Sequence, residues 1–456
     1  MASLNIVIMA AGKGTRMKSA RPKVLHRLAG KSLLQHVLDA VAGLGAAKTL
    51  IVTGHGAETV ETDLRGPGLT FVRQQPQLGT GHAVQQVLPH LDDEGTTLIL
   101  NGDVPLIQAA TAAALAAACG GTRLALLTIE LADASGYGRI VRDGEAVKAI
   151  VEHKDASEAQ RAIREIYTGM LAAPTAWLQR AAMALKNDNA QREYYLTDIV
   201  AMAVADGVPV VATRAASDTE VLGVNSPVQL ADLERRYQRA RAEALMEGSG
   251  VRLADPARFD VRGTLACGSD VEIDVGCVFE GAVTLADNVK IGAHCVIRDA
   301  QIEAGAVIHP FTHIEGARIG AGALVGPYAR LRPGAELGPE VHIGNFVEVK
   351  NSKLAKGAKA NHLAYLGDAT VGERVNFGAG SITANYDGAN KHRSVIGSDV
   401  HVGSNCVLVA PVKIGDGATI GGGSTITKDA PAGQLTLARA KQVSLAGWQR
   451  PKKAGK

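Results

Sequence analysis

The chain has 456 residues, of which 46% are hydrophobic and 20% are charged. This composition is typical of folded globular protein, and a chain of this length is expected to form two or three domains rather than a single core. The net charge is only +3, so no basic field indicates nucleic acid or an anionic membrane as a partner. We therefore expect small-molecule partners.

The cysteines and the N-terminus indicate the compartment. Five cysteines without C-x-x-C spacing argue against a disulfide framework and against a zinc site. The first apolar run stops at Gly12 and Lys13, which makes it too short for a signal peptide or a membrane span. We expect a cytoplasmic protein that does not insert into a membrane.

Up to about Gly223, short apolar runs alternate with longer helical patterns. This alternation predicts βαβ units and a mostly parallel sheet covered on both faces, which is a Rossmann-like α/β fold. The predicted strands are Asn5–Met9, Thr49–Thr53, Thr97–Leu100, Leu124–Ile129 and Val208–Ala212, and the predicted helices include Leu33–Val41, Ala83–Val87 and Ala109–Ala118.

A connecting helix is predicted over Ser226–Glu247, because this segment is charged, has apolar residues at helical spacing and contains no internal Gly or Pro. Glycines and a proline follow it and the composition then changes, which indicates a domain boundary. The predicted organisation is a first domain at 1–225, a linker at 226–250 and a second domain at 251–456.

In the second domain an aliphatic residue recurs at every sixth position from about Ile273 to Ile426. Each six-residue unit supplies a short strand and a corner, and the inward aliphatic residues stack into a continuous core. This spacing predicts a parallel β-helix and disfavours an antiparallel sandwich, in which the period would be two. One series of such residues is Ile319, Val325, Leu331, Leu337, Ile343 and Val349.

The period is interrupted between Thr383 and Ile396, where the sequence is polar. Insertions in solenoids concentrate on functional faces. We therefore expect this segment to project from the β-helix as a loop and to carry function.

The first predicted strand continues into a glycine-rich loop, AAGKGTRM, which begins at Ala10. Glycines allow backbone amides to approach phosphate oxygens, and Lys13, Arg16 and Lys23 supply the positive charge that a triphosphate requires. By itself such a loop is equally compatible with a structural turn. The sequence matches neither a Walker A loop nor G-x-G-x-x-G.

A carboxylate, Asp103, closely follows the predicted strand Thr97–Leu100. Ligands of open α/β sheets bind at the carboxyl ends of strands, so Asp103 is a candidate magnesium ligand. The alternative for a single Asp in this position is a turn or a helix cap.

Several motifs resemble those of the sugar-nucleotide pyrophosphorylases: MAAGKGTRM with Pro22-Lys23, QLGTGH at 77–82, GDVPL at 102–106 and Gly223-Val224-Asn225. With the hexapeptide repeats and the segment from Arg332 to Arg439, nearly the whole chain resembles the bacterial N-acetylglucosamine-1-phosphate uridyltransferase/glucosamine-1-phosphate N-acetyltransferase family. The resemblance implies a left-handed β-helix, a homotrimer, and synthesis of UDP-N-acetylglucosamine for peptidoglycan and lipopolysaccharide.

The resemblance further implies that the phosphate of N-acetylglucosamine 1-phosphate attacks the α-phosphorus of UTP, with Mg²⁺ as cofactor. Arg16 and Lys23 would be catalytic, stabilising charge on the transferring phosphoryl group, and Asp103 and Asn225 would bind the metal. The residues implied to bind UTP or UDP-N-acetylglucosamine are Met9, Ala10, Ala11, Gly12, Lys23, Gln74, Gly79, Thr80, Asn101, Gly102, Asp103, Gly138, Glu152, Tyr167 and Asn225.

Acetyl transfer from a thioester to an amine requires a base of near-neutral pKa, and His362 is the candidate. Taken alone, a His in a solenoid is more often a surface or packing residue. The resemblance implies that His362 is catalytic and that Arg332, Lys350, Tyr365 and Asn376 bind glucosamine 1-phosphate. The residues implied to bind acetyl-CoA are Ala379, Asn385, Tyr386, Ser404, Gly422 and Arg439.

Three positions depart from the family pattern. Tyr167 stands where the resemblance predicts Asn, Asn101 stands where Tyr is frequent, and Gly422 replaces a small Ala. In addition, the basic tail from Lys441 to Lys456 has two interpretations: it contacts coenzyme A phosphates, or its last residues are solvated.

Two other function classes are compatible with parts of the sequence. In one, the β-helix is a structural or regulatory oligomerisation module attached to a pyrophosphorylase, but such a module has no need of His362 or of the Arg332 and Lys350 pair. In the other, the chain is a binding module without activity, which the joint presence of Arg16, Lys23 and Asp103 disfavours.

Overall fold

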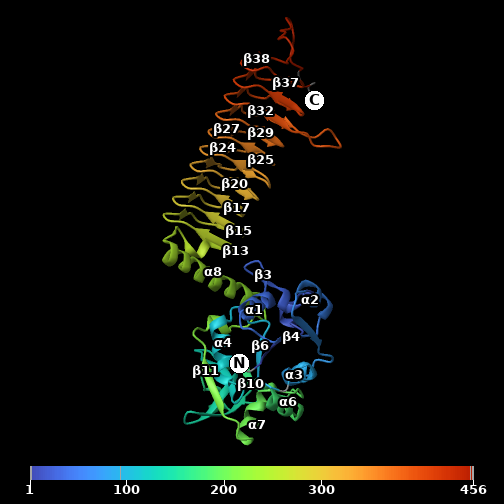
Figure 1. Ribbon diagram of the computed structural model, residues 1–456, viewed down its shortest axis with the longest axis vertical. Coiled ribbons are helices and arrows are strands. Elements are labelled where there is room, and N and C mark those ends of the chain that lie inside the picture. The colour runs from blue at the N-terminus through green and yellow to red at the C-terminus, as the bar shows by residue number, and fades with distance from the viewer. Residues whose placement is uncertain (1–2, 93, 190, 452, 454–456) are drawn as a thin grey trace. The chain divides into compact units, whose positions relative to one another are not determined.

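The computed structural model describes residues 3–92, 94–189, 191–451 and 453 (Figure 1). The chain divides into two compact units, Met1–Tyr237 and Gln238–Lys456, and the division falls within helix α8 (Pro227–Ser249). The predicted connecting helix is thus confirmed, and it extends through Gly248 rather than ending before it. No helix in the described part of the chain is long and apolar enough to cross a membrane.

The first unit is built on a nine-stranded sheet with the main order β11-β7-β10-β6-β1-β4-β5. Strand β10 is antiparallel to β6 and β7, and the other pairs along this path are parallel, so the predicted mostly parallel sheet is confirmed. Its strands are β1 (Leu4–Ala10), β4 (Lys48–Thr53), β5 (Leu69–Arg73), β6 (Thr96–Asn101), β7 (Leu124–Glu130), β8 (Gly138–Asp143), β9 (Ala146–Val151), β10 (Glu165–Pro174) and β11 (Val210–Arg214).

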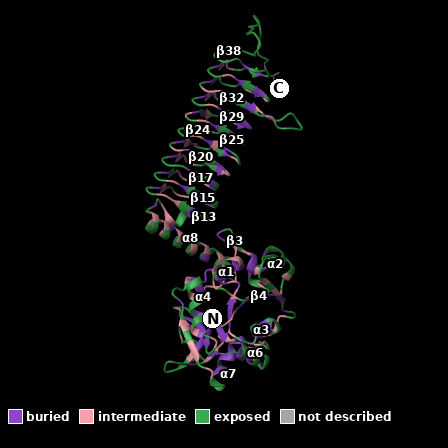
Figure 2. Cartoon of the chain, in the orientation of Figure 1, coloured by how far each residue is buried: buried purple, intermediate pink, exposed green. Residues whose placement is uncertain are grey.

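Apolar side chains project from both faces of this sheet. In β1, Ile6 and Ile8 enter one buried cluster and Val7 enters another, as expected when successive side chains point to opposite faces. Much of the sheet is coloured as buried in Figure 2. Strand β11 begins two residues later than predicted because Pro209 has no N–H to donate to the ladder. The helices of this unit are α1 (Leu33–Val41), α2 (Ala57–Asp63), α3 (Thr80–Val87), α4 (Ala109–Cys119), α5 (Glu158–Arg161), α6 (Thr175–Met183) and α7 (Ile199–Ala205).

The second unit is a β-helix of parallel strands, as predicted. One face carries β12 (Arg252–Leu253), β14 (Glu272–Ile273), β16 (Lys290–Ile291), β18 (Val307–Ile308), β21 (Leu324–Val325), β24 (His342–Asn345), β27 (Lys359–His362), β30 (Asn376–Phe377), β33 (His401–Val402), β36 (Thr419–Ile420) and β38 (Leu435–Thr436). The second carries β19 (His313–Glu315), β22 (Arg330–Leu331), β25 (Glu348–Lys350), β28 (Tyr365–Gly367), β31 (Ile382–Ala384), β34 (Val407–Val409) and β37 (Thr425–Ile426). The third carries β20 (Arg318–Ile319), β23 (Glu336–Leu337), β26 (Lys353–Leu354), β29 (Ala369–Val371), β32 (Ser394–Ile396) and β35 (Val412–Ile414).

The β-helix begins earlier and ends later than the predicted span Ile273–Ile426. Its first coils contain the long strands β13 (Phe259–Cys267), β15 (Cys277–Leu285) and β17 (Val296–Ile302), which run from one face into the next. In β13 and β15 a bend at a positive-φ glycine, Gly263 or Gly281, takes the place of a regular corner. The predicted span includes β15 and β17, whereas β12 and β13 lie before it and were not predicted.

Parallel pairing sets the vertical spacing of the β-helix. Residues 17 or 18 positions apart are paired on successive coils, as for Asn345 with His362 and Arg330 with Glu348. Where a loop is inserted the spacing becomes 25, as for Asn376 with His401. Side chains at equivalent positions of successive coils therefore form columns.

The interruption of the repeat is a projecting loop between β31 and β32, as predicted (Figure 1). A bridge between Tyr386 and Lys391 closes the loop into a hairpin. The Asp387 carboxylate accepts hydrogen bonds from the backbone N–H groups of Ala389 and Asn390 and lies 2.7 Å from Nε2 of His392. These bonds give the loop an internal structure of its own.

Candidate active sites

The strand β1 delivers the glycine-rich loop to a cavity of about 720 Å³. Gly14 has a φ of 59°, and a Cβ there would lie 2.7 Å from Cβ of Lys23, so the loop closes tightly on the following turn. The structure brings most of the predicted nucleotide residues to this cavity: Met9, Ala10, Ala11, Gly12, Arg16, Lys23, Gln74, Gly79, Thr80, Asn101, Asp103 and Asn225. Gly102 does not line it but forms the backbone turn, where its N–H donates to the Met9 carbonyl at 3.0 Å.

Three predicted residues converge on one point of this cavity. The Lys23 ammonium donates to Asp103 Oδ2 and, at 2.9 Å, to Asn225 Oδ1. Asp103 follows β6 and Asn225 precedes α8, so segments 122 positions apart in the sequence supply two oxygens around one cation. The side chains of Lys23 and Asp103 are 13% and 19% exposed, which makes this a shielded rather than a surface ion pair.

One wall of the cavity is held in place by Gln74. Its side-chain amide donates to the Gly79 carbonyl at 2.9 Å and lies 3.2 Å from Nδ1 of His82, while its backbone N–H continues the β4 ladder at Thr53. Gly79 has a φ of 104°, and a Cβ there would lie 2.7 Å from the Tyr194 carbonyl oxygen. Only glycine therefore fits at this approach of two backbones.

A smaller compartment of about 200 Å³ adjoins the cavity through Met9, Thr80 and Asn101. Its remaining predicted members, Gly138, Glu152 and Tyr167, come from the β8–β9 hairpin and from β10 and include the expected sugar contacts. Burial raises the pKa of Glu152, although Thr197 donates a hydrogen bond to its Oε1 at 3.1 Å.

The Tyr167 hydroxyl is buried and has no hydrogen-bond partner among the described residues. Burial, and then the charge of Glu152, raise the pKa of this phenol, so it remains a neutral donor. Leaving a buried polar group unsatisfied costs roughly 1–3 kcal/mol. Such an orphan donor in the wall of a compartment is typical of a group that pairs with a ligand.

Some residues of the cavity wall were not predicted. Lys154, Gln191 and Glu193 line the large cavity, and Lys154 donates to Gln191 Oε1 at 2.6 Å. These residues lie in irregular segments without a glycine motif or a regular period, so no sequence signal identifies them. Thr197, the partner of Glu152, was missed for the same reason.

In the second unit the candidate base has a partner that was not predicted. Nδ1 of His362 lies 3.0 Å from Oδ1 of Asn345, one coil earlier. Since an amide oxygen only accepts, Nδ1 carries the proton and Nε2 is left with its lone pair. His362 is exposed, so Nε2 is accessible. The 17-residue coil spacing would have identified Asn345, but the six-residue period conceals it.

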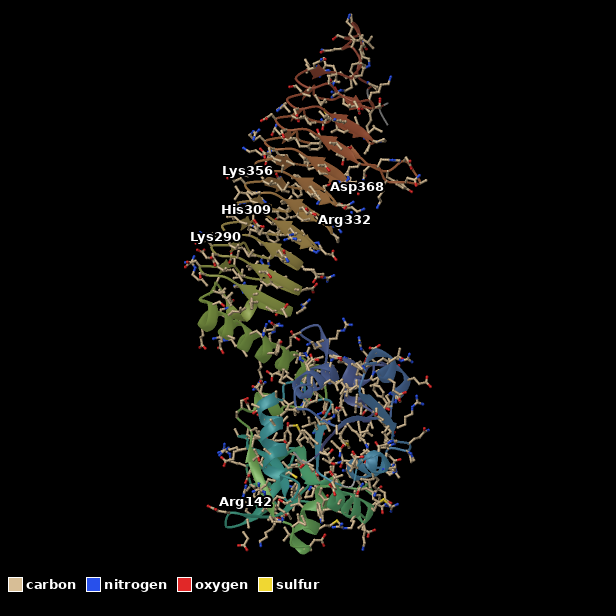
Figure 3. All side chains as sticks on the ribbon, in the orientation of Figure 1. Arg142, Lys290, His309, Arg332, Lys356 and Asp368 are labelled. Atoms are coloured by element: carbon tan, nitrogen blue, oxygen red, sulfur yellow. The ribbon has the colours of Figure 1, made fainter. Side chains whose placement is uncertain are left out.

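The predicted cations lie on the adjoining face. Arg332 donates to Glu348 Oε1 at 2.8 Å, and Glu348 is paired in the strand ladder with Tyr365. Figure 3 shows Arg332 and Asp368 along one side of the β-helix, opposite Lys290, His309 and Lys356. Among the described residues no hydrogen bond joins His362 to Arg332, Glu348 or Tyr365. His362 ends β27, just before the corner that leads to β28, whereas Arg332 directly follows β22 on the second face.

A second cationic group lies next to these. The neighbouring Lys391 ammonium, followed by burial and by Arg332, lowers the pKa of Lys350. Lys391 belongs to the projecting loop, so the loop adds a positive charge to the predicted sugar-phosphate residues. Two like charges that lie close together repel each other, and a bound anion would relieve this repulsion.

The predicted acetyl-CoA residues fall into two sets. Ser404, Gly422 and Arg439 form a column on successive coils, in which Arg439 donates to the Gly422 carbonyl at 2.8 Å, and Ala379 accepts from the neighbouring Asn405 N–H. Asn385 lies apart from this column, 3.5 Å from the Tyr365 hydroxyl.

The remaining predicted contacts are more peripheral. Tyr386 points along the loop and is 61% exposed, and its hydroxyl donates to Gly388. Asn376 lies 3.2 Å from Nδ1 of His401. Of the basic tail, Lys452 and residues 454–456 lie outside the described residues.

All five cysteines are free. Among the described residues no group of three or more His, Cys, Asp or Glu side chains could hold a metal ion.

The raised pKa of Glu152 generates a prediction on stability. Its pKa in the folded protein lies above the ordinary 4.5, so the folded state binds this proton more tightly than the unfolded chain does. The free energy of unfolding then falls as pH rises through the interval between the two values. Glu152→Gln should raise the free energy of unfolding of the first unit at pH 7 in urea titrations, and this gain should vanish below pH 4.5.

Glu61→Gln is the matched control, because the hydrogen bond from Arg73 lowers the pKa of Glu61. Its substitution should reduce stability at pH 7, and this loss should vanish in acid. If both substitutions changed the free energy of unfolding at pH 7 in the same direction, the result would contradict the assigned environment of Glu152.

Two family models match the chain. The MobA-like NTP transferase domain matches residues 6–178, and the bacterial transferase hexapeptide repeat matches residues 316–351 and 393–428. The first match contains most of β1, the glycine-rich loop and Asp103, and the second covers regular coils on both sides of the projecting loop. The two models correspond to the two units of the fold.

Curated relatives match the whole chain. Proteins named "Bifunctional protein GlmU" are 77% identical in Methylibium petroleiphilum over 99% of both chains, 65% identical in Albidiferax ferrireducens over 99% of this chain and 100% of the relative, and 66% identical in Paracidovorax citrulli over 100% of both. Identity at this level over the full length shows the family. The chain belongs to the GlmU family of bifunctional proteins.

Proposed function

We propose that residues 1–225 carry uridylyl transfer, that residues 251–456 carry acetyl transfer, and that residues 226–250 connect them. The chain is a bifunctional transferase that N-acetylates glucosamine 1-phosphate with acetyl-CoA and then transfers uridylyl from UTP to the product, releasing pyrophosphate. The product, UDP-N-acetylglucosamine, is a precursor of peptidoglycan and lipopolysaccharide. The observation that supports this division best is that each unit has its own cluster of reactive residues.

In the first unit, the UTP phosphates lie against the glycine-rich loop, and Arg16 and Lys23 neutralise charge as the sugar phosphate attacks the α-phosphorus. The large cavity holds the nucleotide. The small compartment with Gly138, Glu152 and Tyr167 holds the N-acetylated sugar, to which the orphan Tyr167 hydroxyl donates a hydrogen bond. Such positioning and electrostatic stabilisation account for most of the catalysis in phosphoryl transfer.

Magnesium fits the oxygen pair of Asp103 and Asn225. Both oxygens are hard donors, and both already converge on a cation, the Lys23 ammonium. When bound, Mg²⁺ would neutralise phosphate charge. Lys23 would then be free to turn from Asp103 towards the phosphates.

In the second unit, Nε2 of His362 removes a proton from the ammonium of glucosamine 1-phosphate. The freed amine attacks the thioester carbonyl, the carbon–sulfur bond breaks, and coenzyme A leaves as a thiol after protonation. Arg332, Lys350, Tyr365 and Asn376 hold the sugar phosphate. The column of Ala379, Ser404, Gly422 and Arg439, together with Asn385 and Tyr386, binds acetyl-CoA.

A single assay tests the division. Acetyl-CoA, glucosamine 1-phosphate and UTP are supplied together, and free thiol and pyrophosphate are followed separately. Thiol release must precede pyrophosphate release, because the acetylated sugar is the second substrate. Absence of thiol release, with pyrophosphate formed only when N-acetylglucosamine 1-phosphate is supplied, would favour a structural β-helix attached to a pyrophosphorylase.

His362→Ala should reduce the rate of thiol release by about 10²–10⁴-fold, the usual contribution of a general base, and leave uridylyl transfer to supplied N-acetylglucosamine 1-phosphate unchanged. His313→Ala, which changes an exposed His on the second face, is the matched control and should alter neither rate. Loss of both activities in a folded His362→Ala protein would contradict separate sites.

Asp103→Ala should abolish magnesium-dependent pyrophosphate release while thiol release continues. The variant removes a carboxylate oxygen and also leaves the shielded Lys23 without its anionic partner. Measuring the initial rate of pyrophosphate release as a function of Mg²⁺ concentration distinguishes weakened metal binding from a loss of activity at every Mg²⁺ concentration. If Asp103→Ala transferred uridylyl at the full rate at limiting Mg²⁺, Asp103 would not be a metal ligand.

We further propose a left-handed coil and a cytoplasmic homotrimer. On the corner next to His362, His294, Phe311, Tyr328 and Phe346 stack with ring centroids 5.0–5.5 Å apart, and the last three are 48–57% exposed. An exposed apolar ladder of this kind favours contact with a neighbouring copy. Light scattering should give three times the 47.3 kDa chain mass, and a fully active monomer would contradict the proposal.

A further inference from the structure

Both ends of the projecting loop are attached to one residue, Asp368. At the start of the loop, Nδ2 of Asn385 donates to Oδ2 of Asp368 at 2.5 Å. At its end, the Ser394 N–H donates to the Asp368 backbone carbonyl at 3.1 Å. Everything between these two points projects from the β-helix, so Asp368 fixes the base of the loop.

Asp368 is itself held from the coil below. Oδ1 of its carboxylate accepts from Nδ2 of Asn351 at 2.5 Å, and its backbone N–H donates to the Lys350 carbonyl at 3.0 Å. Asn351 and Asp368 adopt left-handed φ values of 44° and 49°. With Asn385 they occupy one corner of three successive coils, spaced 17 residues apart. This column of three side chains, Asn351, Asp368 and Asn385, joins the regular coils to the loop.

The carboxylate of Asp368 is buried but charged. Burial alone would raise its pKa, but the amides of Asn351 and Asn385 and the charges of Lys350 and Lys391 outweigh burial and lower it. A buried carboxylate that accepts from two side-chain amides restrains both of them, because rotation of either amide would leave an unpaired charge.

We infer that Asp368 is a positioning residue for acetyl transfer, whose carboxylate holds the Asn385 amide, and with it the base of the loop, beside the Tyr365 hydroxyl. This inference rests on the proposed role of Asn385 in binding acetyl-CoA. Asp368 does not itself touch substrate. Its effect on the reaction passes through Asn385 and through the loop that carries Lys391.

Asp299 provides a matched control because it occupies the same corner four coils earlier. Its φ is 46°, close to that of Asp368, but it is exposed, and its Oδ1 accepts a hydrogen bond from the backbone N–H of Ala282. Asp299 lies far along the β-helix from the loop. Asp299→Asn therefore makes the same chemical change at the same type of corner without touching Asn385.

The test is a double-mutant cycle of Asp368→Asn and Asn385→Ala in the full-length protein. The kcat/KM of acetyl transfer and the KM for acetyl-CoA are measured, with uridylyl transfer and thermal unfolding as controls. We expect Asp368→Asn to lower kcat/KM by about tenfold or more, as loss of supporting hydrogen bonds does at other sites, and Asp299→Asn to change it less than about twofold. The double variant should be no worse than Asn385→Ala alone.

Each other outcome overturns a specific statement. If the effects of the two substitutions multiply, Asp368 does not act through Asn385 and the inference alone is wrong. If Asn385→Ala leaves acetyl transfer intact, the assignment of Asn385 is wrong and the inference falls with it. If Asp368→Asn does not fold, the cycle is repeated with Asp368→Glu, which keeps the charge but displaces the carboxylate, and the same two outcomes apply.

Discussion

Each coil of the β-helix is hydrogen-bonded in parallel to the coil before it, and this single constraint organises the second unit. Because paired residues lie 17 or 18 positions apart in the regular coils, a side chain on one of these coils faces the equivalent side chain on the next. The contact is close enough that a Cβ at Gly344 would overlap the Asn361 backbone. The pairing of His362 with Asn345 follows directly from this stacking.

The two units create their sites in different ways. In the first unit, the parallel strands β1 and β6 end at the same edge, so the glycine-rich loop and Asp103 meet there without further devices. In the β-helix no edge collects the strand ends in this way. The candidate reactive residues lie instead in columns of stacked side chains. A break in the repeat then adds the loop that carries Lys391.

Two of the poorly satisfied polar groups in the first unit lie at its candidate site, whereas others, such as the side chain of Asn5, lie elsewhere. The Tyr167 hydroxyl lacks a partner among the described residues, and the Glu152 carboxyl has a raised pKa through burial. Both lower the stability of the free protein. Conflicts between local chemistry and stability concentrate at functional sites, where a ligand removes them.

The sequence by itself determined the fold class, the strand of the glycine-rich loop and the regular coils, because the six-residue period and the strand–helix alternation are local patterns. Local residue patterns supplied Lys23 and Asp103, the motif resemblance added Asn225, and the structure gathered all three at one point. Only the tertiary structure decided that Asn345 holds His362 and that Asp368 holds Asn385. These pairs are set by the stacking of whole coils, and the six-residue pattern of the aliphatic core carries no information about which polar side chains that stacking brings together.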